Sequence, residues 1–220
     1  MEKFNFKDHK NSTIAESYRK IAANIEYANI DKNIKTIMLT SSLASEGKTT
    51  TVCNLAHVMA DANKKMLILD LDLRKPAVHR KYNISNNVGL VDLLMNKDDF
   101  NNYVHNIDKN LEVITTGKIP TNPFEIINSK AIKELIKELS KYFDYILLDT
   151  PPIALVSDPI TIATYADAVI LTIAHGETEK EIARKSVASL KHVNANIIGT
   201  ILNKVPVNKN NKYYYQYNYH

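Results

Sequence analysis

The sequence predicts an α/β domain in which a mostly parallel β-sheet is flanked by helices. Six short, nearly continuous apolar runs indicate strands that are covered on both faces. Helical patterns lie between most of these runs, which is typical of parallel sheets with right-handed crossovers. The 220 residues are also enough for one such domain with a sizeable core.

The elements follow in order along the chain. A helix is predicted over Thr13–Tyr27, opened by a capping box of Thr13 and Glu16. A late helix opens with a second box, Thr178 and Glu181, and runs to about His192. A helix between them has an apolar face of Ile132, Leu135, Ile136 and Leu139. The predicted strands are Thr36–Thr40, Met66–Leu71, Leu111–Thr115, Tyr145–Asp149, Ala168–Ala174 and Ile197–Leu202.

Composition limits the function classes. The formal net charge of +4 is mild and its basic residues are scattered, so nucleic acid is not expected as a partner. Cys53 is the single cysteine, which excludes an internal disulfide and fits a reducing cytoplasm. The N-terminus lacks the apolar core of a signal peptide, and no apolar run approaches the ~20 residues of a membrane span. We predict a domain over residues 1–205 and a flexible, tyrosine-rich tail over residues 206–220.

A phosphate-binding loop is the strongest local signal. The first predicted strand runs into SSLASEGKTT, whose last four residues open a helix. Backbone N–H groups at a helix N-terminus favour a bound triphosphate. We expect Lys48 to reach the β- and γ-phosphates of ATP and Thr49 to give its hydroxyl to Mg²⁺. Ser42 stands where the usual pattern has its first glycine, and the alternative is a chance Gly-Lys-Thr at a helix start.

Acidic residues end two further strands. Asp70 closes the second predicted strand, and Asp72 and Arg74 follow at alternate positions that point the same way in extended chain. Asp149 closes a later strand. Because ligands of open parallel sheets bind at the carboxyl ends of strands, all these motifs can meet at one face. Asp149 suits the role of a metal-organising carboxylate, and Asp70 or Asp72 could accept a proton or bind the metal. The alternative is that such aspartates only cap the next turn or helix.

With these residues, the chain resembles the bacterial tyrosine kinases, or BY-kinases. The resemblance covers nearly the whole chain, through SSLASEGKTT, LDLDLRKP, ILLDTPP, TTGKIPTNPFEII, the late ILNK and the terminal tyrosine cluster. It implies a phosphate-loop NTPase fold and an ATP-dependent protein-tyrosine kinase that phosphorylates its own tail. The family regulates synthesis and export of capsular and other extracellular polysaccharides.

The resemblance also implies roles for individual residues, with Asp70 the preferred catalytic base and Asn203 a contact of the adenine. The implied catalytic residues are Lys48, Asp70, Asp72 and Asp149. The implied ligands of Mg²⁺ are Thr49, Asp72 and Asp149. The implied nucleotide contacts are Ser45, Glu46, Gly47, Lys48, Thr49, Thr50 and Asn203. The implied phosphorylation sites are Tyr213, Tyr214, Tyr215, Tyr217 and Tyr219, which fall within the last eight residues.

Partners follow from the same resemblance. Family members without a membrane segment act with a membrane-anchored activator, whose cytoplasmic segment would recruit this chain to the inner face of the plasma membrane. Subunits of the family pack into a ring through Glu-x-x-Arg-x-x-Arg in the N-terminal helix. Here Glu16 and Arg19 are present, but Ala22 replaces the second arginine.

Two other functions are compatible with this fold. Partition and septum-placing ATPases share the predicted sheet and its acidic strand ends, and many carry a lysine five residues before the phosphate-loop lysine. Leu43 occupies that position here, which favours the kinase. A ring-forming scaffold that binds ATP but barely turns it over is the third interpretation.

Overall fold

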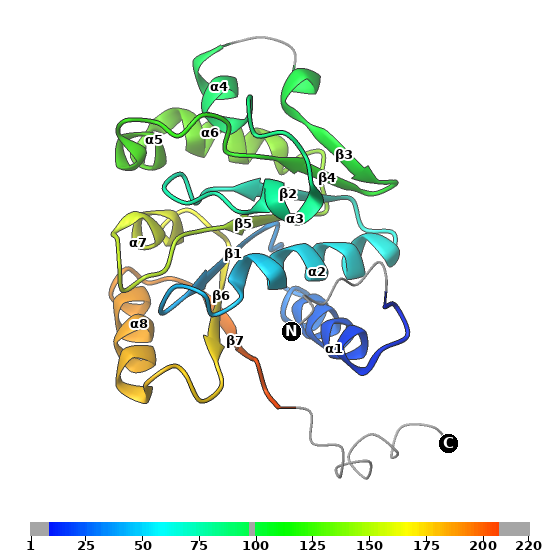
Figure 1. The fold of residues 1–220 in the computed structure, drawn as a ribbon, viewed down its shortest axis with the longest axis vertical. Helices are drawn as coiled ribbons and strands as arrows, with labels where there is room; N and C mark the ends of the chain where they lie inside the picture. The colour runs from blue at the N-terminus through cyan, green and yellow to red at the C-terminus, as the bar shows by residue number, and fades with distance from the viewer. Residues whose placement is uncertain (1–8, 97–99, 207–220) are drawn as a thin grey trace.

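The computed structural model describes residues 9–96 and 100–206 and is built on one seven-stranded sheet. The strand order is β3-β4-β2-β5-β1-β6-β7, with β3 antiparallel to β4 and the other pairs of the described chain parallel (Figure 1). The strands are β1 (Thr36–Ser41), β2 (Met66–Asp70), β3 (His105–Asp108), β4 (Leu111–Ile114), β5 (Tyr145–Asp149), β6 (Ala168–Ala174) and β7 (Ile197–Asn203).

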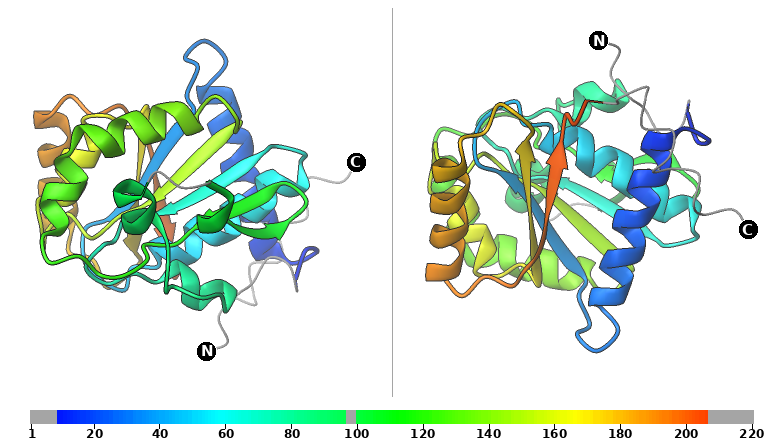
Figure 2. Two further views of the ribbon diagram at one scale, coloured as in Figure 1. Left: turned by 90° about the horizontal axis from the view of Figure 1, so that it is seen from above. Right: turned by 90° about the horizontal axis from the view of Figure 1, so that it is seen from below.

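Helices cover both faces of this sheet, as the two views of Figure 2 make clear. One face carries α1 (Thr13–Ala28), α2 (Lys48–Asp61) and α3 (Val78–Tyr82). The other carries α4 (Leu90–Met95), α5 (Pro123–Asn128), α6 (Lys130–Leu139), α7 (Asp158–Ala163) and α8 (Lys180–His192). A 3-10 helix, η2 (Phe100–Tyr103), precedes β3. The predicted α/β class with a mostly parallel sheet is confirmed.

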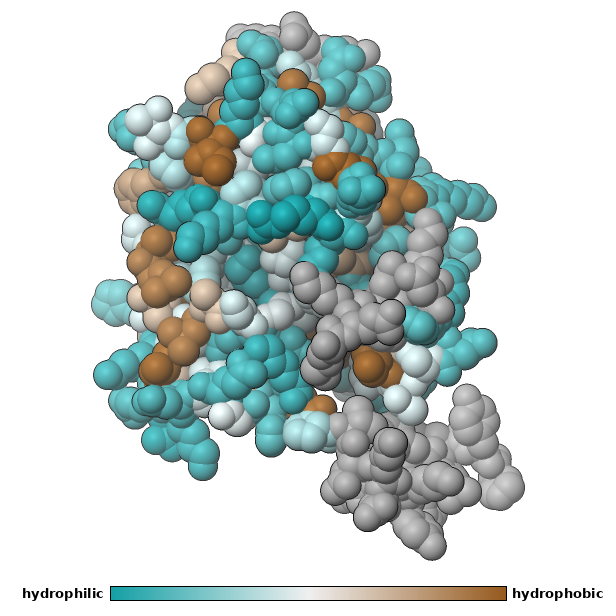
Figure 3. Space-filling model, viewed as in Figure 1, coloured by the Kyte–Doolittle hydropathy of each residue, from teal (hydrophilic) through white to brown (hydrophobic). Residues whose placement is uncertain are grey.

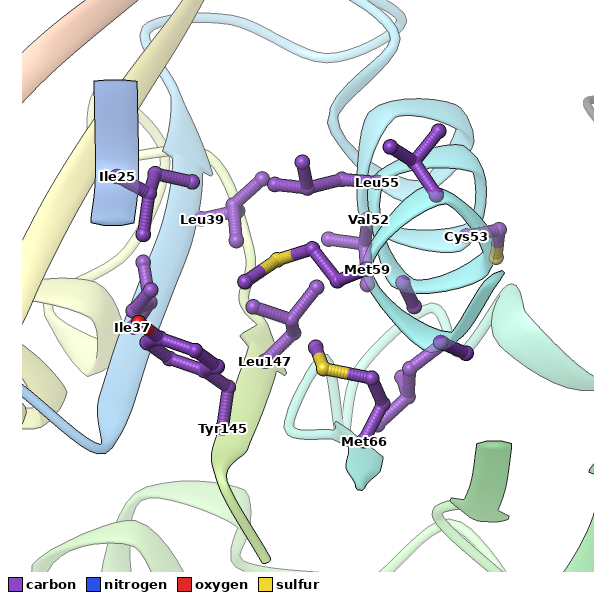
Figure 4. Packing of buried hydrophobic residues seen from close by; sticks show 14 of the residues in the cluster. Ile25, Ile37, Leu39, Val52, Cys53, Leu55, Met59, Met66, Tyr145 and Leu147 are labelled. Carbon is purple, nitrogen blue, oxygen red and sulfur yellow. The ribbon is translucent and has the colours of Figure 1, made fainter. Parts of the chain in front are cut away.

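The core is divided by the sheet into two apolar layers. Successive strand side chains point to opposite faces, so Ile37 and Leu39 of β1 pack under α1 and α2, while Met38 packs in the other layer. Figure 4 shows the first layer, in which Val52 and Met59 of α2 point toward Leu39 and Leu147. Because both layers are covered, the central strands β1, β2, β5 and β6 are nearly continuous apolar runs.

The six predicted strands are confirmed to within a residue at their ends, and β3 was missed. Its segment reads HNID, and its side chains alternate between half-buried and exposed. An edge strand with one partner needs no apolar run, which is why the pattern gave no signal.

Both predicted capping boxes were wrong, although the helices themselves are confirmed. Helix α1 is capped by Ser12, whose hydroxyl accepts from the backbone N–H of Ala15. Helix α8 begins after Glu179, and Thr178 is used elsewhere, at the phosphate loop. In each case the true cap lies one residue away from the predicted one.

The surface seen in Figure 3 is mainly hydrophilic, with hydrophobic residues in small separate groups. Among residues 9–96 and 100–206, no helix combines the length and apolar character that crossing a membrane requires. The five tail tyrosines lie outside the described residues, so the division at residues 205 and 206 stays a prediction.

Candidate active site

The loop between β1 and α2 has the backbone shape of an anion-binding nest. Ser45 and Gly47 both have left-handed backbone, with φ of 65° and 93°. Helix α2 then begins at Lys48, and no side chain caps its N-terminus. Alternating left- and right-handed residues aim consecutive N–H groups into one concavity, where the helix dipole also favours negative charge. The predicted phosphate loop therefore has the local geometry that its sequence implied.

Gly47 is required here for a second reason besides its positive φ. A Cβ at this position would lie 1.9 Å from Nδ2 of Asn203, at the end of β7. That amide nitrogen donates to the main-chain oxygen of Glu46 at 2.9 Å. A side chain at residue 47 would displace the Asn203 amide from this contact, in addition to the strain of a positive φ.

Lys48 connects the loop to two strand-end acids. Its ammonium nitrogen lies 3.2 Å from Oδ1 of Asp149 and 3.3 Å from Oδ2 of Asp72. The hydroxyl of Thr49 donates to Oδ2 of Asp149 at 2.7 Å. The four residues come from α2, the end of β5 and the turn after β2, which the sheet brings together at the carboxyl ends of its strands.

Burial and charge balance one another in this cluster. Burial works against the charged form of Lys48, but the carboxylates of Asp149, Asp72 and Asp70 outweigh it and raise the pKa of the lysine. Burial raises the pKa of Asp149, while the charge of Lys48 and the hydroxyl of Thr49 act in the opposite direction. The lysine is therefore charged, and it offsets the cost of burying the carboxylates.

Asp70 lies beside this cluster and has a structural task. Its carboxylate is fully buried and accepts from the backbone N–H groups of Asp72, Ala77 and Val78. It thus holds the turn after β2 and the start of α3, as the alternative interpretation of strand-end aspartates expected. Burial, followed by the negative charge of Asp149, raises its pKa to about 7. A carboxyl that titrates there is also suited to proton transfer near neutral pH.

Arg74 does not join Asp70 and Asp72, contrary to the expectation of a convergent triad. Its guanidinium binds the buried carboxylate of Asp158, with Nε to Oδ2 at 2.7 Å and a second bond of 3.1 Å. Asp158 begins α7, so this bidentate pair ties the turn after β2 to the segment after β5. The two residues are 84 positions apart, and no local pattern in the sequence links them, so the pair had no sequence signal.

Two further contacts of the loop were not predicted. The hydroxyl of Thr50 accepts from the ammonium of Lys81 in α3 at 2.6 Å. The carboxylate of Glu46 is buried and accepts from the hydroxyl of Thr178. No local pattern links residues so far apart, so neither contact had a sequence signal.

The donor set suits a hard divalent cation that is shared with phosphate. No group of three His, Cys, Asp or Glu side chains within the described ranges could hold a metal by itself. Mg²⁺ usually keeps several waters and takes only one or two carboxylates besides substrate phosphates. The hydroxyl of Thr49 and the carboxylates of Asp72 and Asp149 offer that kind of partial shell.

A cavity of about 630 Å³ lies at the other end of the sheet. It is lined by residues such as Lys65 and Asn110, which precede β2 and β4, and by Leu135 of α6. Because ligands of parallel sheets bind at the carboxyl ends of strands, the cavity is not the candidate site.

Comparisons with known proteins point in one direction. A family model described as an AAA domain matches residues 34–204. The chain is 41% identical over 202 residues to "Tyrosine-protein kinase YwqD" of Bacillus subtilis (strain 168), covering 91% of this chain and 85% of the relative. It is similar to the crystal structure of the chimerical protein CapA2B2, with 32% identity, a TM-score of 0.88, and coverage of 92% and 89%. The kinase domain of Escherichia coli tyrosine kinase ETK has 27% identity and a TM-score of 0.87, with coverage of 95% and 83%.

Proposed function

The chain belongs to the bacterial tyrosine kinases, and we propose that it transfers the γ-phosphoryl group of ATP to tyrosines of its own C-terminal segment. The activity of a tyrosine-protein kinase follows from the family. The observation that carries the site assignment is the meeting of Lys48, Thr49, Asp72 and Asp149 beside a left-handed phosphate loop. The alternative function, that of a partition ATPase, has less support, because Leu43 stands where many of those proteins carry an additional lysine.

Nucleotide phosphates are assigned to the nest. The backbone N–H groups from Ser45 to Thr50 and the ammonium of Lys48 would bind them. In the structure Lys48 is held by two carboxylates, so binding must exchange these partners for phosphate oxygens. The lysine then stabilises the charge that develops on the transferring group, which is how phosphoryl transfer is mainly catalysed.

Metal binding is assigned to Thr49, Asp72 and Asp149. The two carboxylates that Lys48 releases become available to a cation of higher charge, and the Thr49 hydroxyl lies against one of them. When bound, Mg²⁺ supplies positive charge that neutralises the phosphate oxygens. Asp149 is fully buried, so a divalent cation also offsets the burial of its charge.

The tyrosine hydroxyl needs a proton acceptor. Asp70 is our assignment, because its pKa of about 7 allows both protonation states near neutrality. Asp72 is the more accessible of the two acids, with 5% of its surface exposed against 0% for Asp70. Separate variants of the two residues distinguish them.

Asn203 is assigned to the adenine. Its amide nitrogen is engaged by Glu46, whereas its Oδ1 has no partner among the described residues. An amide oxygen is an acceptor for the exocyclic amino group of adenine. Asn203 also ends β7, at the same edge of the sheet as the phosphate loop.

The acceptor tyrosines are assigned to the tail. Tyr213, Tyr214, Tyr215, Tyr217 and Tyr219 follow a described chain that leaves β7 on the nucleotide side. Fourteen residues beyond Pro206 could span about 50 Å when extended, so reach alone permits transfer within one chain or to a neighbour. Membership of the family favours transfer to the tail of a neighbouring chain.

Assembly and cellular role are proposed on the same basis. We propose that the chain controls capsular or other extracellular polysaccharide synthesis. We also propose that it acts with a membrane-anchored activator and assembles into a ring-like homo-oligomer. Within α1, the predicted ring residues Glu16 and Arg19 bind each other at 3.1 Å, and Arg19 also donates to the main-chain oxygen of Lys10. An intersubunit contact of Arg19 would therefore have to compete with partners in its own chain.

The intact mass of the protein purified from bacteria tests this function. Repeated additions of roughly 80 Da, lost on treatment with a tyrosine phosphatase, would support autophosphorylation. A chain that binds ATP and magnesium but gains no phosphate, alone or with its activator, would instead support the scaffold or switch.

A further inference from the structure

Glu46 is unusual because it is a buried carboxylate inside a loop that binds phosphate. Only 3% of its surface is exposed, and both of its carboxylate oxygens have donors. Oε2 accepts from the backbone N–H of Leu43 at 2.7 Å, and Oε1 accepts from the hydroxyl of Thr178. The bond to Leu43 links two residues within the phosphate loop, and the bond to Thr178 links the loop to the turn after β6.

The hydroxyl of Thr178 is used twice. While it donates to Glu46, it accepts from the backbone N–H of Ala174, the last residue of β6, at 3.0 Å. Only a hydroxyl can accept and donate in this way, so serine can replace threonine here and valine cannot. The side chain therefore works as a bridge between the strand end and the loop.

The turn that carries Thr178 is itself fixed to β7. The backbone N–H of His175 donates to the main-chain oxygen of Asn203 at 2.8 Å, and Lys204 pairs with Glu177 at 2.6 Å. Asn203 also holds the main-chain oxygen of Glu46. Glu46 is thus held by two neighbouring strand ends. The turn after β6 holds its side chain, and Asn203 at the end of β7 holds its main-chain oxygen.

This support lies where the loop needs it. Ser45 and Gly47, on either side of Glu46, have left-handed backbone. Such backbone at a non-glycine residue costs free energy and persists only where the surroundings determine it. If the support at residue 46 is lost, the flanking N–H groups are free to turn away from the phosphates.

We propose that Glu46 and Thr178 form a positioning pair that keeps the phosphate loop in its nucleotide-binding shape. Neither side chain needs to touch ATP. Their function is to organise the loop in advance, so that binding does not have to order it. This inference rests on the proposed ATP-dependent activity, and it concerns residues on different elements that are 132 positions apart.

The decisive comparison is Thr178→Val against Thr178→Ser, measured with a fluorescent ATP analogue and with tail phosphorylation. We expect Thr178→Val to raise Kd roughly 10- to 100-fold, as for a lost hydrogen bond to a charged group. KM for ATP should rise by a similar factor, and kcat should fall less. Thr178→Ser should remain within about threefold of the unaltered chain, because it keeps the hydroxyl.

Controls separate positioning from general stability. Thr164→Val makes the same chemical change at an exposed hydroxyl that only donates to Thr161, before β6 begins, and should leave Kd unchanged. If Thr178→Val does not fold, Glu46→Leu replaces it, since leucine removes both acceptor oxygens and should weaken binding at least as much. A double variant should lose no more than the worse single one, since the pair acts as a unit.

Equal Kd values for Thr178→Val and the unaltered chain would overturn the positioning pair, and so would an equal loss in Thr178→Ser. An unaltered chain that binds the analogue but phosphorylates no tyrosine would overturn the proposed function alone.

Discussion

Asp70 and Asp149 are register partners at the last position where β2 and β5 pair. This places two fully buried carboxyls at adjacent strand ends, yet only Asp149 contacts Lys48. Asp149 has a cation and a hydroxyl as partners, whereas Asp70 has backbone N–H groups. The different surroundings imply different tasks for the two acids, and variants can tell them apart.

Added magnesium should restore activity to the variant of one of these acids and not to the variant of the other. We expect Asp70→Asn to lower turnover by at least about 100-fold, within the range of general-base effects, and Asp149→Asn to lower it sharply as well. Added Mg²⁺ should partly restore Asp149→Asn, because that change weakens metal binding. It should not restore Asp70→Asn, which removes the proton acceptor. Rates measured across a magnesium titration test this.

The matched control is Asp61→Asn, which alters an exposed, ion-paired carboxylate at the far end of α2 and should change neither rate nor magnesium dependence. Equal rescue of both site variants would mean that the roles are assigned wrongly.

The pH dependence should report Asp70. We expect kcat/KM for ATP to rise with pH and to level off above about 7, the pKa of this carboxyl in the nucleotide-free protein. The sign follows from its role, since a base is active only when ionised and its pKa is raised. Below the pKa of Asp70, kcat/KM should fall about tenfold for each pH unit.

The inflection should remain in Asp72→Asn and disappear in Asp70→Asn, whatever the remaining rate. An inflection that persists in Asp70→Asn and disappears in Asp72→Asn would transfer the base to Asp72.

Lys48→Met should abolish phosphorylation and leave the secondary structure intact. The ammonium is the group placed to bind the β- and γ-phosphates, and it also compensates two acids, Asp72 and Asp149. We therefore expect the free energy of unfolding to fall by about 3 kcal/mol near pH 8, the scale for breaking a buried pair.

The loss of unfolding free energy in Lys48→Met should be smaller near pH 5 than near pH 8. Without the lysine the pKa of Asp149 rises further in the folded state, so stability falls as pH rises toward that value. Chemical denaturation at both pH values, followed by circular dichroism, measures the effect. Lys64→Met, at an exposed pair with Glu26, is the control and should cost less than about 1 kcal/mol. Retained phosphorylation in Lys48→Met would refute the role of this lysine.

Transfer should occur between chains. Full-length Lys48→Met chain cannot phosphorylate itself, so mixing it with an active chain ending at Pro206 leaves one source of activity and one set of tail tyrosines. We expect mass spectrometry to find phosphate on the inactive chain, at Tyr213 to Tyr219. A full-length Lys48→Met chain with these tyrosines changed to phenylalanine is the control. An unlabelled inactive chain would rule out transfer between chains.

Phosphorylation should also release the assembly. Each phosphotyrosine adds about −1.5 to −2 charges, so five add roughly −8 to −10. This exceeds the formal net charge of +4 and crowds like charges at adjacent active sites. Light scattering before and after ATP should show a smaller mass, and an unchanged mass after full phosphorylation would contradict the switch.

The sequence by itself determined the sheet and the place of the site. Strands covered on both faces must be apolar throughout, so β1, β2 and β5 are visible as runs, and their carboxyl ends identify where Lys48, Asp70 and Asp149 meet. These features depend on local burial and chain direction, which short patterns record.

Only the tertiary structure decided which partners the charged side chains take. Arg74 pairs with Asp158, and Glu46 pairs with Thr178, across separations of 84 and 132 residues. Strand β3 likewise depends on the edge that β4 offers, since Ile107 is its only apolar residue. Such contacts depend on how the helices and turns pack around the sheet, and packing joins segments that no local pattern connects.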